Sequence, residues 1–243
     1  MTISDPGFRL ETQIALPENE VHLWRIDLAA VSGGEQRWKE ILSSDERERS
    51  ARFHFSQDRQ FFTATRALLR IIAGNYVDSD PTKLIFQYSE KEKPSLTQSG
   101  SASQLEFNVS HSGAMALLAF ARGRALGVDV EQIRDNFDHA AIARRFFSEE
   151  EQRQLAELVP SERYHGFFRC WTRKEAYIKA QGAGLSLPLH QFDVSLRPRD
   201  VNALLSTRPD STEAARWSLQ DLVAGDDYVA ALCVQGHGWS LKL

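Results

Sequence analysis

The chain has 243 residues, of which 42% are hydrophobic and 26% are charged, a composition that is ordinary for a soluble globular protein with a sizeable core. Its formal net charge of -4 argues against nucleic acid as the main partner, because duplex binding normally needs a basic surplus. No apolar stretch approaches the roughly 18 residues needed to cross a bilayer, and the first residues do not read as a secretion signal. Cys170 and Cys233 form no CxxC pair, so neither a disulfide framework nor a zinc site is indicated. We therefore expect a cytoplasmic protein that does not bind a membrane.

Hydrophobic spacing predicts a chain that mixes strands and helices. In the first part we expect a helix that begins near Ser44 and another over residues 58–73, and strands at residues 21–28, 84–88, 105–109 and 115–121, with a serine-rich connection at 97–103. In the second part we expect a strand at residues 126–131, a helix that begins after Ser148, a helix over about 162–181 that ends at Gly182, and strands near 192–196, 216–219, 228–234 and the C-terminus.

The chain also resembles itself. Residues 51–60 (ARFHFSQDRQ) are similar to residues 143–152 (ARRFFSEEEQ), and each segment is followed by a long helix with a Thr-Arg step and then by strands. This order predicts an α+β fold of two similar α/β halves related by a pseudo-twofold axis, with a ligand cleft between them. The expected halves are residues 1–124 and 125–243.

Two acidic residues on one strand and a third on a later helix are the most informative feature of the sequence. In a strand, Asp129 and Glu131 point to one side while the valines beside them point into the protein. On the helix, Glu175 and Lys179 are four residues apart and lie along one stripe. Three carboxylates beside a lysine suit a Mg²⁺ ion that holds a substrate's phosphates. Taken alone, each motif is more typical of a solvated edge strand or of an ordinary helix-surface ion pair.

Other polar segments are suited to binding phosphate, although each alone is more typical of a solvated turn or helix surface. The hydroxyls and backbone N–H groups of Ser110 and Ser112, together with His111, could reach an oxyanion at the end of a strand. Lys93 precedes Pro94, whose ring fixes the local backbone. The early basic residues that could join them are Arg47, Arg49 and Arg66. The sequence contains no GxxxxGK[ST], no GxGxxG after a strand and no HExxH, which disfavours a P-loop NTPase, a dinucleotide enzyme and a zinc protease.

Together these segments resemble the motifs of the phosphopantetheinyl transferases. Residues 127–131 (GVDVE) and 171–179 (WTRKEAYIK) are similar to the two signature motifs of that family, and residues 107–113 (FNVSHSG) and 93–94 (KP) to its upstream segments. The length and the internal repeat resemble the long, pseudodimeric class typified by the surfactin synthetase activator. One departure is Glu92, which stands where the family has glycine before Lys-Pro.

The resemblance implies a reaction and a set of roles. Phosphopantetheine would pass from coenzyme A to a serine of an apo acyl, peptidyl or aryl carrier protein, leaving adenosine 3′,5′-bisphosphate. Asp129, Glu131 and Glu175 would hold Mg²⁺, and Glu175 would accept the serine proton, directly or through water. Lys179 would contact the phosphates and stabilise the departing one. The further residues implied as coenzyme A contacts are Lys93, Pro94, Ser110, His111, Arg47, Arg49 and Arg66.

Two other functions stay open at this point. Another Mg²⁺-dependent phosphoryl or nucleotidyl transferase could use the same carboxylates without needing a carrier protein. A non-catalytic module that binds coenzyme A or a carrier is disfavoured, because binding alone does not require groups that act on a transition state. Fatty acid, polyketide and nonribosomal peptide carriers are equivalent candidates as partners. We expect a monomer, since an internal repeat lets one chain supply both sides of the cleft.

Overall fold

The computed structural model describes residues 1–10, 13–89, 93–97, 104–134, 137–182, 184, 187–200 and 202–243. Glu92 and most of the serine-rich connection at 97–103 therefore lie outside the described residues. None of the helices in the described ranges is both long enough and apolar enough to span a membrane.

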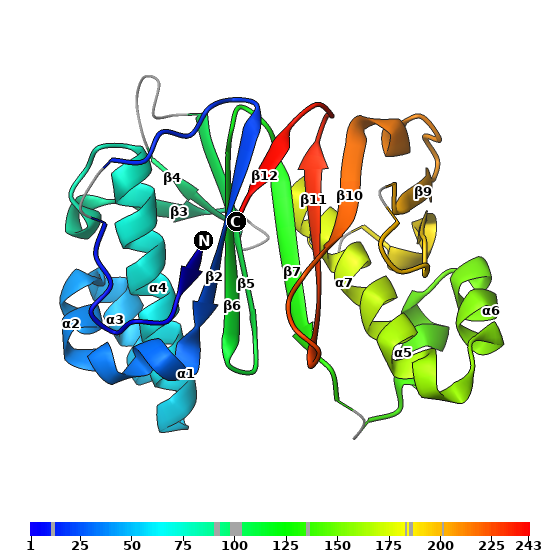
Figure 1. Ribbon diagram of the computed structural model, residues 1–243, viewed down its shortest axis with the longest axis horizontal. Coiled ribbons are helices and arrows are strands. Elements are labelled where there is room, and N and C mark those ends of the chain that lie inside the picture. Colours follow the sequence, from blue (N-terminus) through cyan, green and yellow to red (C-terminus); the bar gives the residue numbers. More distant parts are fainter. Residues whose placement is uncertain are drawn as a thin grey trace.

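Two β-sheets lie side by side at the centre of the molecule (Figure 1). The larger sheet has the order β1-β2-β6-β5, and β12 also pairs with β2; its strands are β1 (Thr2–Ile3), β2 (Glu20–Asp27), β5 (Leu105–Ser112), β6 (Met115–Arg122) and β12 (Ser240–Lys242). The smaller sheet has the order β10-β11-β7, with strands β7 (Leu126–Gln132), β10 (Trp217–Leu222) and β11 (Tyr228–Gln235). Two hairpins complete the strands: β3 (Phe86–Tyr88) with β4 (Pro94–Leu96), and β8 (Phe192–Val194) with β9 (Leu204–Thr207).

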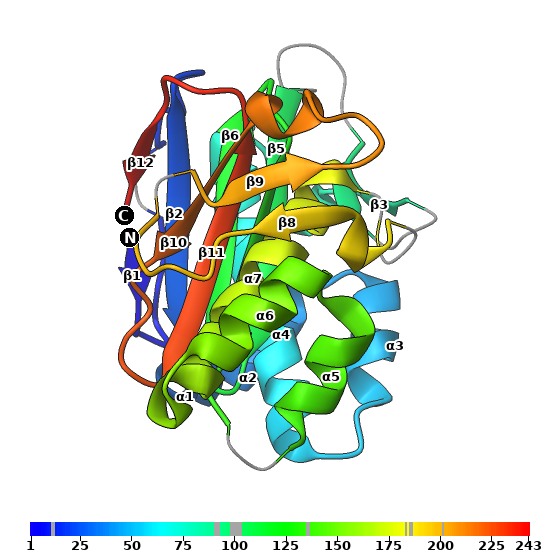
Figure 2. The same ribbon diagram turned by 90° about the vertical axis from the view of Figure 1, so that its right-hand side faces the viewer.

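One group of helices lies beside each sheet. Beside the larger sheet are α1 (Leu28–Val31), α2 (Glu35–Ile41), α3 (Ser44–Ala51) and α4 (Ser56–Tyr76), and beside the smaller sheet are α5 (His139–Phe146), α6 (Glu149–Glu157) and α7 (Arg163–Gln181). Seen from the side, the β8–β9 hairpin lies above α6 and α7 (Figure 2). Single 3-10 turns occur at Ser32–Gly34, Pro81–Lys83, Pro160–Glu162, Leu189–Gln191 and Glu213–Arg216.

The ends of two helices confirm their predicted signals. The Ser148 side chain accepts the Glu151 N–H at the start of α6, and the Glu151 carboxylate accepts the Ser148 N–H in return. At its other end, α7 stops where Gly182 takes a left-handed conformation with φ 66°. Glycine is favoured there because it has no Cβ to clash with the preceding turn.

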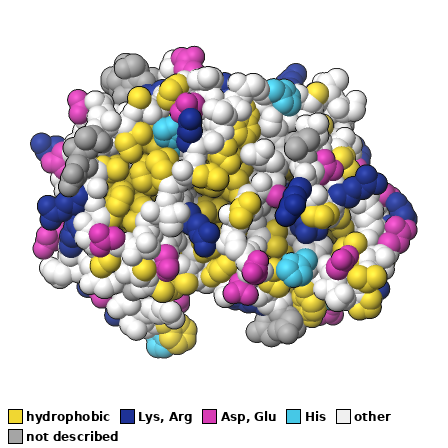
Figure 3. Space-filling view, viewed as in Figure 1, with side chains coloured by type: hydrophobic (Ala, Val, Ile, Leu, Met, Phe, Trp, Pro, Cys, Tyr) yellow, Lys and Arg dark blue, Asp and Glu magenta, His cyan; other side chains and the backbone are white. Residues whose placement is uncertain are grey.

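Apolar packing forms three clusters. The first lies between the larger sheet and its helices and includes Trp38, Leu68 and Phe120, and the second, beside the smaller sheet, includes Phe167 and Tyr177. The third cluster draws on strands of both sheets; its fully buried members include Val21, Ala119, Leu126, Val128, Ala230, Leu232 and Val234. Burial of this shared apolar surface holds the two sheets together. On the face shown in Figure 3, hydrophobic side chains gather over the central strands and charged side chains lie mostly toward the rim.

The mixed α/β fold and the longer elements agree with the sequence patterns, whereas several short elements are not predicted. These are α1, α2, α5, β1, β4 and β9, each of eight residues or fewer. Such segments contain too few repeats of a hydrophobic period to be recognised. The similarity of residues 51–60 to 143–152 also falls on different elements: the first segment joins α3 to α4, and the second joins α5 to α6. Both are helix–turn–helix junctions, and this explains their likeness.

Candidate active site

The predicted acidic pair lies where the two sheets meet. β5 is at the edge of the larger sheet and β7 is at the edge of the smaller one, and the two strands run side by side (Figure 1). Alternate side chains of β5 accept backbone N–H groups of β7: Asn108 from Val128 at 2.9 Å, Ser110 from Val130 at 3.3 Å and Ser112 from Gln132 at 3.1 Å. We call these three side chains and their N–H partners the β5–β7 seam. It satisfies backbone donors that would otherwise be unpaired at a buried strand edge.

Asp129 lies within this seam and is only 3% exposed. Its Oδ1 accepts hydrogen bonds from Ser110 Oγ at 2.8 Å and from Lys179 Nζ at 2.6 Å. Its Oδ2 is buried and has no hydrogen-bond partner among the residues that the structure describes. One oxygen is therefore fixed by protein groups, and the other remains available to a ligand.

Helix α7 brings Glu175 and Lys179 to the same place. It approaches β7 so closely that a Cβ on Gly127 would lie 2.2 Å from the Ala176 carbonyl oxygen. Lys179 Nζ then reaches Asp129, Ser110 Oγ at 3.0 Å and the Val128 carbonyl at 3.4 Å. The lysine side chain is 29% exposed, so the ammonium group is open to solvent on one side.

The remaining two carboxylates respond to burial and to one another. Burial, followed by the charges of Asp129 and Glu131, raises the pKa of Glu175 to about 6, although Lys179 opposes the shift. Burial and the charge of Asp129 likewise raise the pKa of Glu131, whose Oε2 accepts the Ser112 hydroxyl at 2.8 Å. The charge of Asp129 contributes to both shifts, so the three acids share one electrostatic environment.

The three acids provide the type of ligand atom that a hard cation prefers, but their side chains are not yet close enough together to surround one. In the described part of the chain, no group of three or more His, Cys, Asp or Glu side chains is arranged to hold a metal ion. The unpartnered Asp129 Oδ2 is nevertheless an unfavourable feature in a buried site, and a cation would satisfy it. Carboxylate oxygens are also the ligands that Mg²⁺ prefers. The donor set fits Mg²⁺, and the side chains of Glu131 and Glu175 would have to draw closer to Asp129 around the ion.

Two hollows flank these carboxylates. One, of about 560 Å³, lies between α4 and the turn after β5, and its lining includes His111, Ser112 and Asp58. Withdrawal from water and the charge of Lys179 lower the pKa of His111, and Asp58 opposes the shift. The other hollow, of about 380 Å³, is largely apolar and is lined by Glu131 together with aromatic side chains of the C-terminal part of the chain.

Comparison with known proteins decides the family. A model described as the 4′-phosphopantetheinyl transferase superfamily matches residues 125–233, and a model described as the N-terminal part of 4′-phosphopantetheinyl transferase matches residues 34–122. The chain is 40% identical over 229 residues to the 4′-phosphopantetheinyl transferase HetI of Nostoc sp., covering 94% of this chain and 93% of that protein. The chain belongs to the 4′-phosphopantetheinyl transferase family. It is also 33% identical over 223 residues to a putative 4′-phosphopantetheinyl transferase of Synechocystis sp. (89% of this chain, 87% of that protein) and 32% identical over 161 residues to Sfp of Bacillus subtilis (66% and 69%).

The basic residues expected to bind coenzyme A in this transferase are engaged elsewhere. Lys93 Nζ donates to the carbonyl oxygens of Leu126 at 3.2 Å and Ala180 at 3.3 Å. It thereby caps the C-terminal end of α7. Pro94 begins β4 and pairs with Tyr88.

Of the early arginines, Arg66 is buried within the fold, whereas Arg47 and Arg49 are exposed at its surface. Arg66 forms a buried ion pair with Glu46 and donates to the Tyr88 hydroxyl at 2.8 Å. Arg47 donates to the Leu42 carbonyl, and the Arg49 guanidinium lies 5.5 Å from the centre of the Phe62 ring. The structure does not bring these side chains to the carboxylates, and their contacts with coenzyme A stay predictions.

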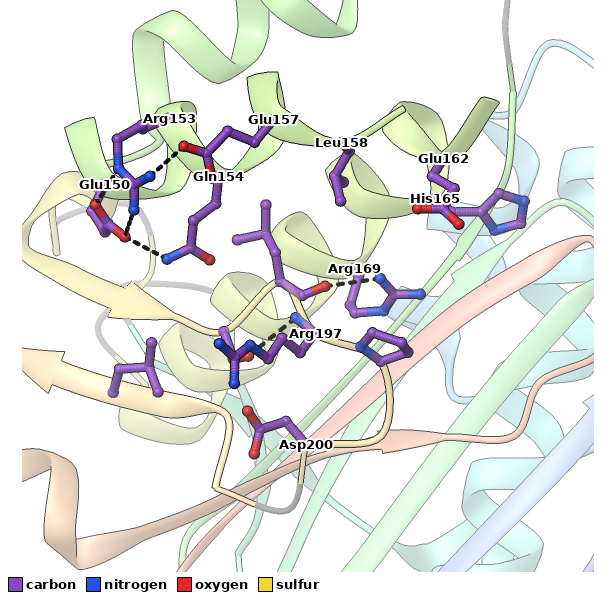
Figure 4. A pocket seen from close by; sticks show the side chains of 14 residues that line it. Glu150, Arg153, Gln154, Glu157, Leu158, Glu162, His165, Arg169, Arg197 and Asp200 are labelled. Carbon is purple, nitrogen blue, oxygen red and sulfur yellow. Dashed lines mark hydrogen bonds and ion pairs between the residues drawn. The ribbon is translucent and has the colours of Figure 1, made fainter. Parts of the chain in front are cut away.

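A larger hollow of the transferase, about 810 Å³, lies apart from the acids (Figure 4). It is bounded by α6, α7 and the chain after β8, and none of the predicted site residues lines it. Several of its charged groups are paired with one another, since Arg153 forms ion pairs with Glu150 and Glu157. Arg169 donates a hydrogen bond to the Leu196 carbonyl. Size alone therefore does not identify the reactive site.

The part that Asn108 and Ser112 play in the seam was not predicted from the sequence. The signal was present in the polar residues at positions 108, 110 and 112, whose spacing of two places them on one face of a strand. What the sequence did not show is that a second strand, without a backbone ladder to β5, lies against that face.

Proposed function

We propose that this chain transfers the phosphopantetheine group of coenzyme A to a serine hydroxyl of an apo carrier protein and releases adenosine 3′,5′-bisphosphate. The observation that carries the proposal is the meeting of Ser110, Asp129 and Lys179, from three separate segments, at hydrogen-bond distances in the β5–β7 seam. Family membership supports the substrate class, because the relatives are named as 4′-phosphopantetheinyl transferases.

The side chains suit this reaction. The hydroxyl oxygen of the carrier's serine forms a bond to the phosphorus next to pantetheine, and the bond from that phosphorus to the bridging oxygen of the pyrophosphate breaks. Negative charge therefore gathers on the departing bisphosphate. Lys179 is held beside Asp129 and can neutralise that charge without first being ordered. Glu175 has a pKa raised to about 6, which makes it a suitable acceptor for the serine proton near neutral pH, directly or through water.

We infer that Asp129, Glu131 and Glu175 hold Mg²⁺, which when bound supplies positive charge to the pyrophosphate. The unpartnered Asp129 Oδ2 supports this assignment, as does the raised pKa of the other two acids. Both features describe a site with more negative charge than its own lysine balances.

For coenzyme A we propose the 560 Å³ hollow and the surface beside it, where His111 is a candidate phosphate contact. Ser110, which does not line the hollow, would have to exchange one of its present partners to bind a phosphate. Pro94, Arg47 and Arg49 remain proposed contacts from the surrounding segments. Lys93 and Arg66 would have to leave their present partners, two backbone carbonyls and Glu46, to bind a phosphate.

We further propose that the chain is a pseudodimer, with halves 1–124 and 125–243 related by a pseudo-twofold axis. The element order supports this: a strand, helices, a hairpin and two strands occur first as β2, α2–α4, β3–β4, β5 and β6, and again as β7, α5–α7, β8–β9, β10 and β11. The strand orders β2-β6-β5 and β7-β11-β10 correspond, and all these pairs are antiparallel. A single chain then supplies both sides of the site, in keeping with a monomer.

The decisive experiment incubates the purified protein with coenzyme A, Mg²⁺ and a panel of apo fatty acid, polyketide and peptide carriers. Mass spectrometry should show that at least one carrier gains one phosphopantetheine group, and that a carrier whose acceptor serine is replaced by alanine gains none. Consumption of coenzyme A or a nucleotide without any carrier would favour another phosphoryl transferase. Binding of coenzyme A with no carrier modified would favour a binding module.

A further inference from the structure

We propose that Ser110 and Ser112 are positioning residues that act across the β5–β7 seam, each directing its single hydroxyl proton onto one carboxylate of β7 and so fixing how the acid pair is presented to a cation. The inference rests on the proposed function and deepens it. It makes the metal site dependent on groups that belong to the opposite sheet.

Ser112 shows the arrangement in its simplest form. A hydroxyl has one proton to donate and can accept two hydrogen bonds. Ser112 Oγ accepts the Gln132 N–H at 3.1 Å, and this group can act only as a donor. The Ser112 proton is therefore directed to its other neighbour, Glu131 Oε2, at 2.8 Å.

The direction of the Ser110 hydroxyl proton is fixed by one more partner than that of Ser112. Its Oγ accepts from the Val130 N–H at 3.3 Å and from the Lys179 ammonium at 3.0 Å, and both partners are donors only. With both acceptor positions of the oxygen filled, its proton has one remaining partner, Asp129 Oδ1, at 2.8 Å. The direction of this hydrogen bond follows from counting donors and acceptors.

The consequence is that the register of β5 against β7 orients both acids together. Ser110 and Ser112 are two residues apart, as are Asp129 and Glu131, so equal strand spacing matches each hydroxyl to its own carboxylate. At Asp129 the serine holds one oxygen and leaves the buried Oδ2 without a partner. Hydrogen bonds to the ligands of a metal orient those ligands and strengthen binding.

Asn108 offers a matched control within the same seam. It lies two residues before Ser110 on the same face of β5, is buried, and accepts the Val128 N–H at 2.9 Å. In the described part of the chain its side chain has no hydrogen bond to a carboxylate. A variant at this position removes one contact between the strands and leaves Asp129 and Glu131 with their serines.

The test measures Mg²⁺ affinity by calorimetric titration with the metal alone and again with saturating coenzyme A, and measures unfolding for each protein. Ser112→Ala and Ser110→Ala should weaken Mg²⁺ binding by about 10- to 100-fold, the usual loss when a ligand's hydrogen-bond partner is removed. Ser112→Thr keeps the hydroxyl and should restore most of the affinity. Asn108→Ala should lower the melting temperature and leave Mg²⁺ affinity unchanged.

Wild-type Mg²⁺ affinity in both serine-to-alanine variants would overturn the proposal. So would an equal loss of affinity in Asn108→Ala, because the seam would then act only by holding the strands together. Wild-type protein that binds no Mg²⁺ under either condition would also overturn it. Failure of the proposed function is a separate result: the wild-type protein would bind Mg²⁺, and lose it in the serine variants, yet modify no carrier.

Discussion

At the level of single residues, the site gathers more negative charge than it neutralises. Asp129 is paired with Lys179, but burial and the neighbouring acids raise the pKa of both Glu131 and Glu175. A cation placed among them would remove this repulsion and stabilise all three ionised carboxylates. This charge balance is consistent with the proposal that these residues bind a metal and that Glu175 accepts a proton.

This charge balance leads to a prediction for Glu175→Gln. The substitution keeps the shape of the side chain but removes its charge and its basicity, so transfer to the carrier should be abolished even with saturating Mg²⁺. Because one of several repelling carboxylates is neutralised, the melting temperature should stay equal to that of the wild type or rise. Carrier modification and thermal unfolding are measured on the same samples. Turnover close to the wild-type value would remove Glu175 from the mechanism.

The sequence predicted which acids share a strand face and which acid and lysine share a helix face, because both patterns depend on residues that are close in the chain. Asp129 and Glu131 follow the two-residue period of a strand, and Glu175 and Lys179 the four-residue spacing of a helix. Contacts made between distant segments left no such signal. The two carbonyls that hold the amine of Lys93 belong to residues 33 and 87 positions away along the chain.

At the level of elements, two similar helix starts show how the number of cationic partners sets the direction in which the pKa of a buried acid shifts. Glu46 and Glu151 both belong to capping boxes and are both buried. Burial alone would raise the pKa of Glu46, but Arg66 and Arg70 together lower it. For Glu151, burial outweighs the single ammonium of Lys174, and the pKa is raised.

The Glu46 ion pairs predict a pH-dependent effect of Glu46→Gln. At pH 7 the variant should be less stable by about 3–5 kcal/mol, since two buried arginines lose their carboxylate. The pKa of Glu46 is lowered in the folded state. Its contribution to the free energy of unfolding is therefore complete above the ordinary pKa of 4.5 and is lost as the pH falls through the pKa of the folded state. Denaturant titrations of both proteins should therefore give stabilities that approach one another as the pH falls below 4.5. A stability difference that stays constant from pH 7 to pH 3 would contradict this account.

The contact between β7 and α7 leads to a prediction for Gly127→Ala. The added Cβ would lie 2.2 Å from the Ala176 carbonyl oxygen and 2.3 Å from the Ala180 nitrogen, so helix and strand must separate. We expect a loss of about 1–3 kcal/mol in the free energy of unfolding, and a loss of transfer because Lys179 moves away from Asp129. Gly33→Ala is the control, since its added Cβ has no atom of a described residue within 4 Å apart from those of Gly33 and its chain neighbours. Unchanged activity in a destabilised Gly127→Ala protein would show that the close approach does not position the lysine.

At the scale of the whole molecule, the order of the longer elements could be predicted from the sequence, but the way the sheets join could not. Hydrophobic periods indicate which strands have a buried face, and the buried valines beside Asp129 agree with that expectation. They do not indicate that the partner of that face belongs to the other sheet. The third apolar cluster, which includes Val21, Leu117, Val128 and Leu232, depends on this long-range arrangement.

That shared cluster predicts that the chain unfolds in one cooperative step. Separation of the sheets would expose buried surface from both, so neither should persist alone. In a variant that retains only Trp38, in the first cluster, and in one that retains only Trp217, in the second, tryptophan fluorescence should report the same urea midpoint as far-ultraviolet circular dichroism of that variant. Leu232→Ala, in the third cluster, should lower both midpoints together, by the equivalent of about 2–5 kcal/mol. Two separate midpoints, or a shift in only one of them, would mean that the sheets are stable independently and that the β5–β7 seam can open while each remains folded.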